Sequence, residues 1–91
     1  MKTVFIKVYG KVQGVFFRQT TIAKAKELSL TGYALNARDG TVEIMAQGMP
    51  ENIDQLIAWC HHGPERARVN KVDVQAVGEK ISFRSFELRY P

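Results

Sequence analysis

The stretch from Gly10 to Arg18 combines the residue types that bind anions in proteins. Gly10 and Gly14 lie between a strand-like run and a helix-like run, and Arg18 follows at the start of the helix-like run. A loop of this kind can turn several backbone N–H groups toward one anion, and the helix N-terminus adds positive potential. A cation in the first turn of a helix costs about 0.3–1 kcal/mol unless an anion joins it there. Arg18 therefore predicts a bound phosphate or carboxylate.

The same residues also have ordinary structural explanations. An arginine after a strand-to-helix turn can be a solvated side chain that binds nothing. Asn36 precedes Asp39-Gly40, and asparagine is favoured where a turn tolerates positive φ. From the pattern alone, both a bare turn and an anion-binding loop remain open for Gly14–Arg18, and Asn36 is typical of a turn residue.

Two longer motifs resemble a known family. Residues 10–18 read Gly-x-Val-Gln-Gly-Val-x-Phe-Arg, and residues 32–43 read Gly-Tyr-Ala-Leu-Asn-Ala-Arg-Asp-Gly-Thr-Val-Glu. Together they are similar to the paired signature of the acylphosphatases, small enzymes that hydrolyse the carboxyl–phosphate mixed anhydride. The similarity continues through Gly63–Val69 and Phe83–Tyr90, so the resemblance spans nearly the whole chain.

The resemblance implies a role for each motif. The expected substrate is a small-molecule acyl phosphate, and the expected products are a carboxylate and inorganic phosphate. Arg18 and Asn36 are the expected catalytic residues: Arg18 binds the phosphoryl group, and the Asn36 amide, which both donates and accepts hydrogen bonds, positions the attacking water. We expect Asp39-Gly40 to be structural and to set the loop that presents Asn36. The expected phosphate-binding residues are Gly14, Val15, Phe16, Phe17 and Arg18.

Neither motif contains a general acid. No histidine, cysteine or suitably paired carboxylates occur in residues 10–18 or 32–43, so proton transfer to a leaving group would lack a donor. An acyl phosphate does not need one, because it expels a carboxylate whose acid has a pKa of about 4. Electrostatic stabilisation and positioning can then carry the reaction. We therefore expect an enzyme that needs no metal and no cofactor.

The other reactive side chains favour structural roles. His61 and His62 face different sides of a helix, and no Asp, Glu or Cys lies at metal-ligand spacing from them, so we expect no metal site. Cys60 falls on an apolar stripe, which predicts a buried and inert thiol. Of Phe16 and Phe17, we expect one to pack in the core and the other to lie at the rim of the anion-binding loop.

The composition is typical of a small folded protein. The chain has 91 residues, of which 45% are hydrophobic, and carries a net charge of +4. This length predicts one domain over residues 1–91 with one two-layer core. No apolar run approaches the ~18–20 residues of a membrane span, and no signal-peptide core is visible. The single cysteine cannot form an internal disulfide. We therefore expect a cytoplasmic monomer.

Hydrophobic periodicity predicts a strand–helix–strand unit that occurs twice. Alternation predicts strands over residues 3–9, 32–36, 41–47, 69–77 and 82–90. Helical spacing predicts one helix over residues 19–29 and a second from Pro50 to His62, with an apolar stripe at Ile53, Leu56, Ile57 and Cys60. The order βαββαβ predicts a ferredoxin-like α+β sandwich, with an antiparallel sheet of four to five strands and two helices on one face. We expect the final short strand to extend or edge the sheet.

Two other functional classes fit this fold but not the motifs. An RNA-binding domain of the same topology needs aromatic residues on its two central strands. Residues 41–47 include none, and the first strand offers only Phe5 and Tyr9. A ferredoxin-like regulatory module would normally be attached to a catalytic domain, for which this chain has no room. We therefore expect no nucleic-acid or membrane partner.

Overall fold

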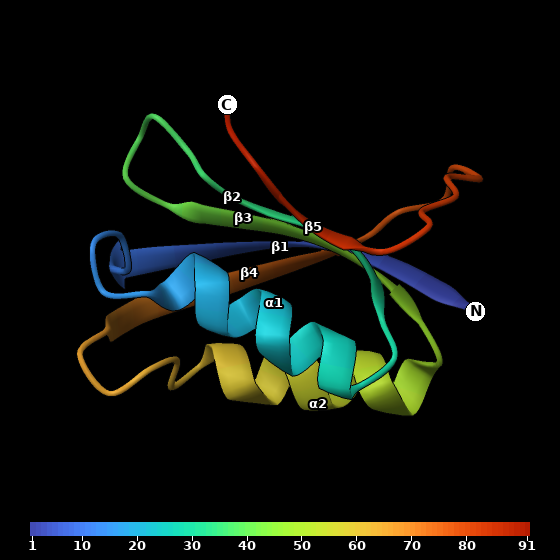
Figure 1. The fold of residues 1–91 in the computed structure, drawn as a ribbon, viewed down its shortest axis with the longest axis horizontal. Helices are drawn as coiled ribbons and strands as arrows, with labels where there is room; N and C mark the ends of the chain where they lie inside the picture. The colour runs from blue at the N-terminus through green and yellow to red at the C-terminus, as the bar shows by residue number, and fades with distance from the viewer.

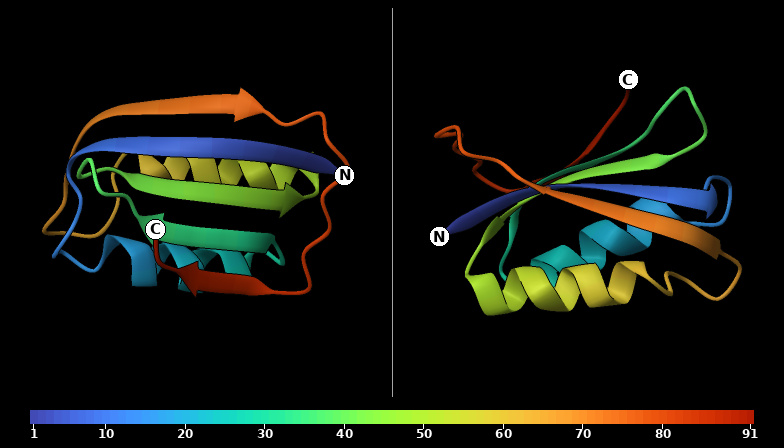
Figure 2. Two further views of the ribbon diagram at one scale, coloured as in Figure 1. Left: turned by 90° about the horizontal axis from the view of Figure 1, so that it is seen from above. Right: turned by 180° about the vertical axis from the view of Figure 1, so that it is seen from behind.

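The computed structural model describes all residues 1–91, which form a layer of helices against one face of a β-sheet (Figure 1). The sheet has five strands in the order β4-β1-β3-β2-β5 (Figure 2), and both helices cover the same face. The predicted ferredoxin-like α+β fold is confirmed. No helix is both long enough and apolar enough to cross a membrane. The elements are β1 (Lys2–Lys11), α1 (Phe17–Glu27), β2 (Thr31–Asn36), β3 (Val42–Gly48), α2 (Pro50–Cys60), β4 (Arg68–Ala76) and β5 (Phe86–Arg89).

The core lies between the sheet and the two helices. Full burial of an apolar side chain such as Ile53 or Leu56 of α2 contributes about 1.5–3 kcal/mol. Cys60 lies in the same buried stripe, and burial raises the pKa of its thiol to about 12. The alternating apolar residues of β1 and β3 all face the helices and are buried: Val4, Ile6, Val8, Val42, Ile44 and Ala46.

Helix α1 begins two residues before the predicted start at residue 19. Phe17 opens the helix because its ring enters the core, with its centroid 5.3 Å from that of Trp59. Before it, Phe16 has a left-handed φ of 65°, and its carbonyl accepts a hydrogen bond from the Thr20 amide at 3.0 Å. As a consequence, Arg18 lies in the first turn of α1.

The last strand differs from the prediction in length and direction. The pattern predicts a strand over residues 82–90 in an antiparallel sheet, whereas β5 has four residues and pairs parallel with β2. The connection from β4 crosses the end of the sheet at which β4 ends and β2 begins: there the Val77 amide donates to Thr3 and the Gly32 amide donates to Ser85. Because β5 starts beside the start of β2, both strands run in one direction. The sheet is therefore mixed.

The register of β3 brings the ends of β1 and β2 together. Both strands pair antiparallel with β3, so they run in the same direction. Val42 of β3 lies opposite Val8 of β1 on one side and opposite Asn36 of β2 on the other. Since neighbouring strands are about 4.8 Å apart, the loop that follows β1 and the last residue of β2 lie at the same end of the sheet.

Candidate active site

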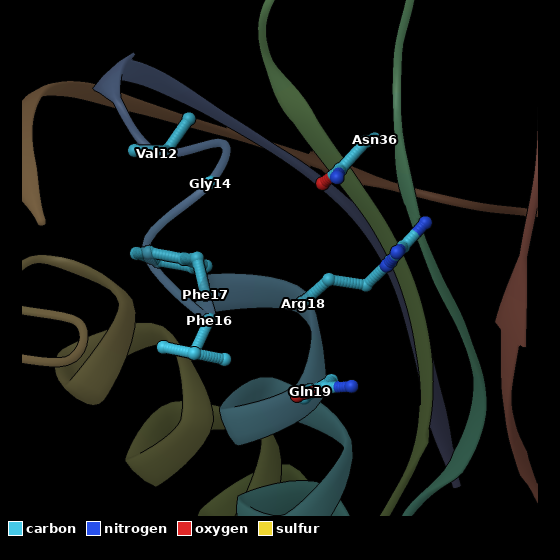
Figure 3. A pocket seen from close by; sticks show the side chains of 7 residues that line it. All are labelled: Val12, Gly14, Phe16, Phe17, Arg18, Gln19 and Asn36. Atoms are coloured by element: carbon cyan, nitrogen blue, oxygen red, sulfur yellow. The ribbon is translucent and has the colours of Figure 1, made fainter.

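A pocket of about 260 Å³ opens at this end of the sheet. In Figure 3 the Arg18 side chain extends from the start of α1, and the Asn36 amide points from the end of β2 toward the loop between β1 and α1. This loop, residues 12–16, is called the cradle loop below. The predicted site residues line the pocket together, except for Val15, whose side chain is buried. The lining residues are Val12, Gly14, Phe16, Phe17, Arg18, Gln19 and Asn36.

The backbone of the cradle loop and of the start of α1 presents amides without acceptors. Gly14 has a φ of 74° and Phe16 a φ of 65°, and left-handed residues in such a loop turn successive N–H groups toward one concave side. Gly14 adopts this conformation without the steric cost that a Cβ imposes. None of the N–H groups from Val15 to Gln19 donates a hydrogen bond within the chain, and the helix has no side-chain cap. These N–H groups and the positive end of α1 suit an anion.

Arg18 adds a full positive charge to the first turn of α1, which contains no acidic residue. Its Nε is buried and has no hydrogen-bond partner. The guanidinium carbon lies 5.2 Å from the centroid of the Tyr90 ring, an attractive contact that still leaves the N–H donors unused. Because a buried donor without a partner destabilises the fold, the arrangement favours an acceptor, such as a phosphate oxygen, beside Arg18.

Asn36 supplies the complementary group. Its Oδ1 is buried and accepts no hydrogen bond within the chain. Arg18 Nε and Asn36 Oδ1 are the only buried side-chain polar atoms of the chain without a partner, and both belong to residues that line the pocket. The pocket therefore holds one unpartnered donor and one unpartnered acceptor, which can bind an anion and a water molecule side by side.

The hairpin between β2 and β3, which follows Asn36, contains a short polar network. Asp39 Oδ1 accepts hydrogen bonds from the Thr41 hydroxyl at 2.6 Å and from the Thr41 amide at 3.1 Å. Asp39 Oδ2 lies 2.9 Å from the Lys7 ammonium of β1. The hydrogen bonds from the Thr41 hydroxyl and from Lys7 hold the pKa of Asp39 well below its ordinary value. Asp39 thus has the structural role that the sequence predicts for it.

Two residues beside the pocket were not singled out by sequence. Gln13 of the cradle loop donates two hydrogen bonds to the β2–β3 hairpin. Tyr90 comes to Arg18 from the far end of the chain, beyond β5. The only sequence signal for Gln13 is that an amide side chain stands in the first motif, between Val12 and Gly14. No local pattern points to Tyr90.

The structure also places the two phenylalanines of the first motif, Trp59 and the two histidines. Phe17 is buried and Phe16 is 66% exposed, so the predicted division between core and rim is confirmed. Trp59 packs against Phe17 rather than lining the pocket. No group of three or more His, Cys, Asp or Glu side chains is placed to hold a metal ion, and His61 and His62 have no such partners.

Comparison with known proteins shows the family of this chain. A family model described as Acylphosphatase matches residues 4–88. The chain belongs to the acylphosphatase family. An acylphosphatase of Methylococcus capsulatus is 45% identical over 86 residues, which are 94% of each chain. The family that the two sequence motifs resemble is therefore confirmed.

Solved acylphosphatase structures share the fold over nearly their whole length. The acylphosphatase from Coxiella burnetii superposes with a TM-score of 0.92 at 38% identity, covering 97% of this chain and 92% of that chain. The acylphosphatase from Bacillus subtilis reaches a TM-score of 0.95 at 29% identity, covering 99% and 100%. This chain therefore shares its ferredoxin-like fold with solved acylphosphatases.

The left-handed conformation of Phe16 predicts a stability change. A non-glycine residue in this region costs about 1–2 kcal/mol, and asparagine tolerates it better than phenylalanine. Since most of the Phe16 ring is exposed, Phe16→Asn should raise the free energy of unfolding by about 0.5–1 kcal/mol in urea denaturation. The comparison variant is Phe17→Ala, which should lower it by about 3–5 kcal/mol because that ring is buried. A Phe16→Asn variant less stable than the wild type would contradict the assignment of strain.

The Asp39 network predicts a pH dependence. Because the pKa of Asp39 is depressed in the folded state, its stabilising effect is present at neutral pH and is lost as pH falls below the ordinary carboxyl range of about 4. Asp39→Asn should therefore be less stable than the wild type at pH 7, and the gap should narrow by pH 3 in urea denaturation. Asp54→Asn, the same change at an exposed site of α2, should show no such narrowing. A gap that persists at pH 3 would exclude this role of the carboxylate.

Proposed function

We propose that this chain hydrolyses acyl phosphates by holding the phosphoryl group on the cradle and positioning a water molecule on Asn36. The backbone N–H groups of Val15–Arg18 and the guanidinium of Arg18 bind the phosphoryl oxygens. The observation that carries the proposal is the pair of unpartnered buried atoms, Arg18 Nε and Asn36 Oδ1, on residues of one pocket. Membership of the acylphosphatase family supports the reaction itself.

The reaction follows from what these groups can do. A water molecule that donates a hydrogen bond to Asn36 Oδ1 attacks the phosphorus atom, while Arg18 and the cradle amides stabilise the charge on the phosphoryl oxygens. The bond between phosphorus and the carboxyl oxygen breaks, and the electron pair leaves with the carboxylate. The proton of the water passes to a phosphoryl oxygen, so the products are a carboxylate and inorganic phosphate. Asn36 stays neutral throughout because an amide does not titrate.

The pocket selects its leaving group by what it lacks. No lining residue is a histidine, cysteine or carboxylate, so none can protonate a basic leaving oxygen. A carboxylate leaves without a proton because its acid has a pKa of about 4. An alkyl phosphate would expel an alkoxide and should react far more slowly. The site therefore suits mixed anhydrides of phosphate over ordinary phosphate esters.

The remaining features of the proposal concern the whole chain. We propose that residues 1–91 act as one domain and one monomer, in the cytoplasm, without a metal, a cofactor or a nucleic-acid partner. The absence of aromatic residues from the central strand β3 supports the last point, since RNA-binding sheets of this topology stack bases on aromatics of both central strands. A steep salt dependence of RNA binding would contradict it.

Arg18→Ala should lower kcat for benzoyl phosphate by about 1,000-fold or more, because removal of one neutral pre-organised donor already costs about 100–1,000-fold. The assay is the ultraviolet-followed hydrolysis at saturating substrate, with and without chelator. The wild-type rate should not change with chelator. Arg84→Ala removes the same charge at an exposed position between β4 and β5 and should act like the wild type. A loss of less than about tenfold for Arg18→Ala would remove Arg18 from the mechanism.

Asn36→Ala should separate water positioning from phosphate binding. We expect kcat to fall by about 100–1,000-fold, while the inhibition constant of inorganic phosphate stays within about twofold of the wild type, because the cradle and Arg18 are intact. Steady-state kinetics with phosphate as competitive inhibitor measure both quantities. If phosphate affinity collapses together with kcat, Asn36 is a binding residue and the assigned role is wrong.

A further inference from the structure

We propose that Gln13 is a positioning residue that fixes the distance between the cradle loop and Asn36. The inference rests on the proposed function, because it concerns how the water-positioning residue is held relative to the bound phosphate. Gln13 does not line the pocket, so it acts through the backbone of its neighbours. No substrate contact is assigned to it.

The contacts of Gln13 join the two loops that form the site. Its Nε2 donates one hydrogen bond to the Ala37 carbonyl at 2.7 Å and another to the Thr41 carbonyl at 3.0 Å. These two residues lie at the base of the β2–β3 hairpin loop, where the Ala37 amide also donates to the Thr41 carbonyl at 2.9 Å. Ala37 directly follows Asn36 in the chain. Gln13 therefore ties the cradle loop to the residue next to Asn36.

Asn36 depends on its backbone for its position. Its side-chain oxygen has no partner within the chain, and no side-chain hydrogen bond fixes its amide. The place of that amide is therefore set by the end of β2 and by the hairpin that follows. Since a reacting group displaced by 1 Å can lose about 100-fold in rate, a hydrogen bond that fixes this hairpin relative to the phosphate has a direct effect on kcat.

A second side-chain contact of the hairpin joins it to a different part of the chain. The Lys7–Asp39 ion pair, 2.9 Å long, connects the hairpin to β1 in the sheet. Only Gln13 connects the hairpin by side-chain hydrogen bonds to the cradle loop, which carries the phosphate-binding amides. Its own loop is held on both sides, because Val12 and Val15 are buried in the core. The link is therefore between two fixed segments, and its loss should change their spacing.

An amide suits this position chemically. It offers two N–H donors from one nitrogen to two carbonyl oxygens, and it brings no charge close to the phosphate. A glutamate of the same size would have no N–H donor and would add a negative charge beside two carbonyls and an anion. A leucine would fill the space without donating. These two substitutions therefore remove the link and keep the volume.

Gln47 offers a matched control within the chain. Its Nε2 also donates two long-range hydrogen bonds, to the Thr3 hydroxyl at 2.9 Å and to the Ile81 carbonyl at 2.6 Å. It lies in β3 at the end of the sheet opposite the pocket, since it pairs with Thr31 at the start of β2. Gln47→Leu and Gln13→Leu thus remove the same chemistry and should shift the urea midpoint by similar amounts. Only Gln13→Leu should affect catalysis.

The test is a double-mutant cycle between Gln13 and Asn36, measured as kcat for benzoyl phosphate and as the inhibition constant of inorganic phosphate. Gln13→Leu should lower kcat about 10- to 100-fold and leave KM and phosphate inhibition within about twofold. In the Asn36→Ala background the same change should lower kcat by less than about twofold, because its effect passes through Asn36. Gln47→Leu should leave kcat unchanged in both backgrounds.

Three results would overturn the inference: an unchanged kcat for Gln13→Leu, an equal loss in the Asn36→Ala background, or an equal loss for Gln47→Leu. If Gln13→Leu does not fold, the same cycle is run with Gln13→Met, which is also neutral and has no N–H donor, so these criteria apply to it. Failure of the proposed function is distinguishable, because Asn36→Ala alone would then retain its kcat. A loss for Asn36→Ala without a loss for Gln13→Leu contradicts only the role of Gln13.

Discussion

The register of β3 between β1 and β2 is the constraint on which the site depends. Val8 and Asn36 lie opposite the same residue, Val42. The loop that follows β1 and the asparagine that ends β2 must therefore lie at the same end of the sheet. The buried alternation of β1 and β3 holds this register, because a slip by one residue would expose the whole apolar face. The buried residues that stabilise the core therefore also fix the geometry of the site.

The electrostatics of the pocket complete the account. The N-terminus of α1, the unpartnered amides of the cradle loop and Arg18 all present positive potential, and no acidic residue in the first turn offsets it. A site of this kind favours an anion at every stage of the reaction and binds charge that develops on the phosphoryl oxygens without rearrangement. The same features that leave polar groups unsatisfied in the ligand-free chain make the pocket complementary to a phosphate.

Sequence predicted the parts that local pattern determines. Alternation predicted the strands β1 and β3, helical spacing predicted the apolar stripe of α2, and the two motifs pointed to Arg18 and Asn36. The parallel pairing of β5 and the contacts of Tyr90 and Gln13 could not be predicted from the sequence. They depend on segments far apart in the chain, 24 and 28 residues for the two Gln13 bonds, and periodicity reports only on near neighbours. The early start of α1 was missed because core packing of Phe17 overrides local helix preference.

The most direct measurement is a titration of the isotopically labelled protein with inorganic phosphate, followed through its amide resonances by NMR. We expect the largest shifts on the backbone amides from Val15 to Gln19 and on the side chains of Arg18 and Asn36, and we expect Arg18→Ala to weaken phosphate binding at least tenfold. Shifts centred on another surface, or phosphate affinity unchanged in Arg18→Ala, would contradict the claim that this loop and this arginine bind the phosphoryl group.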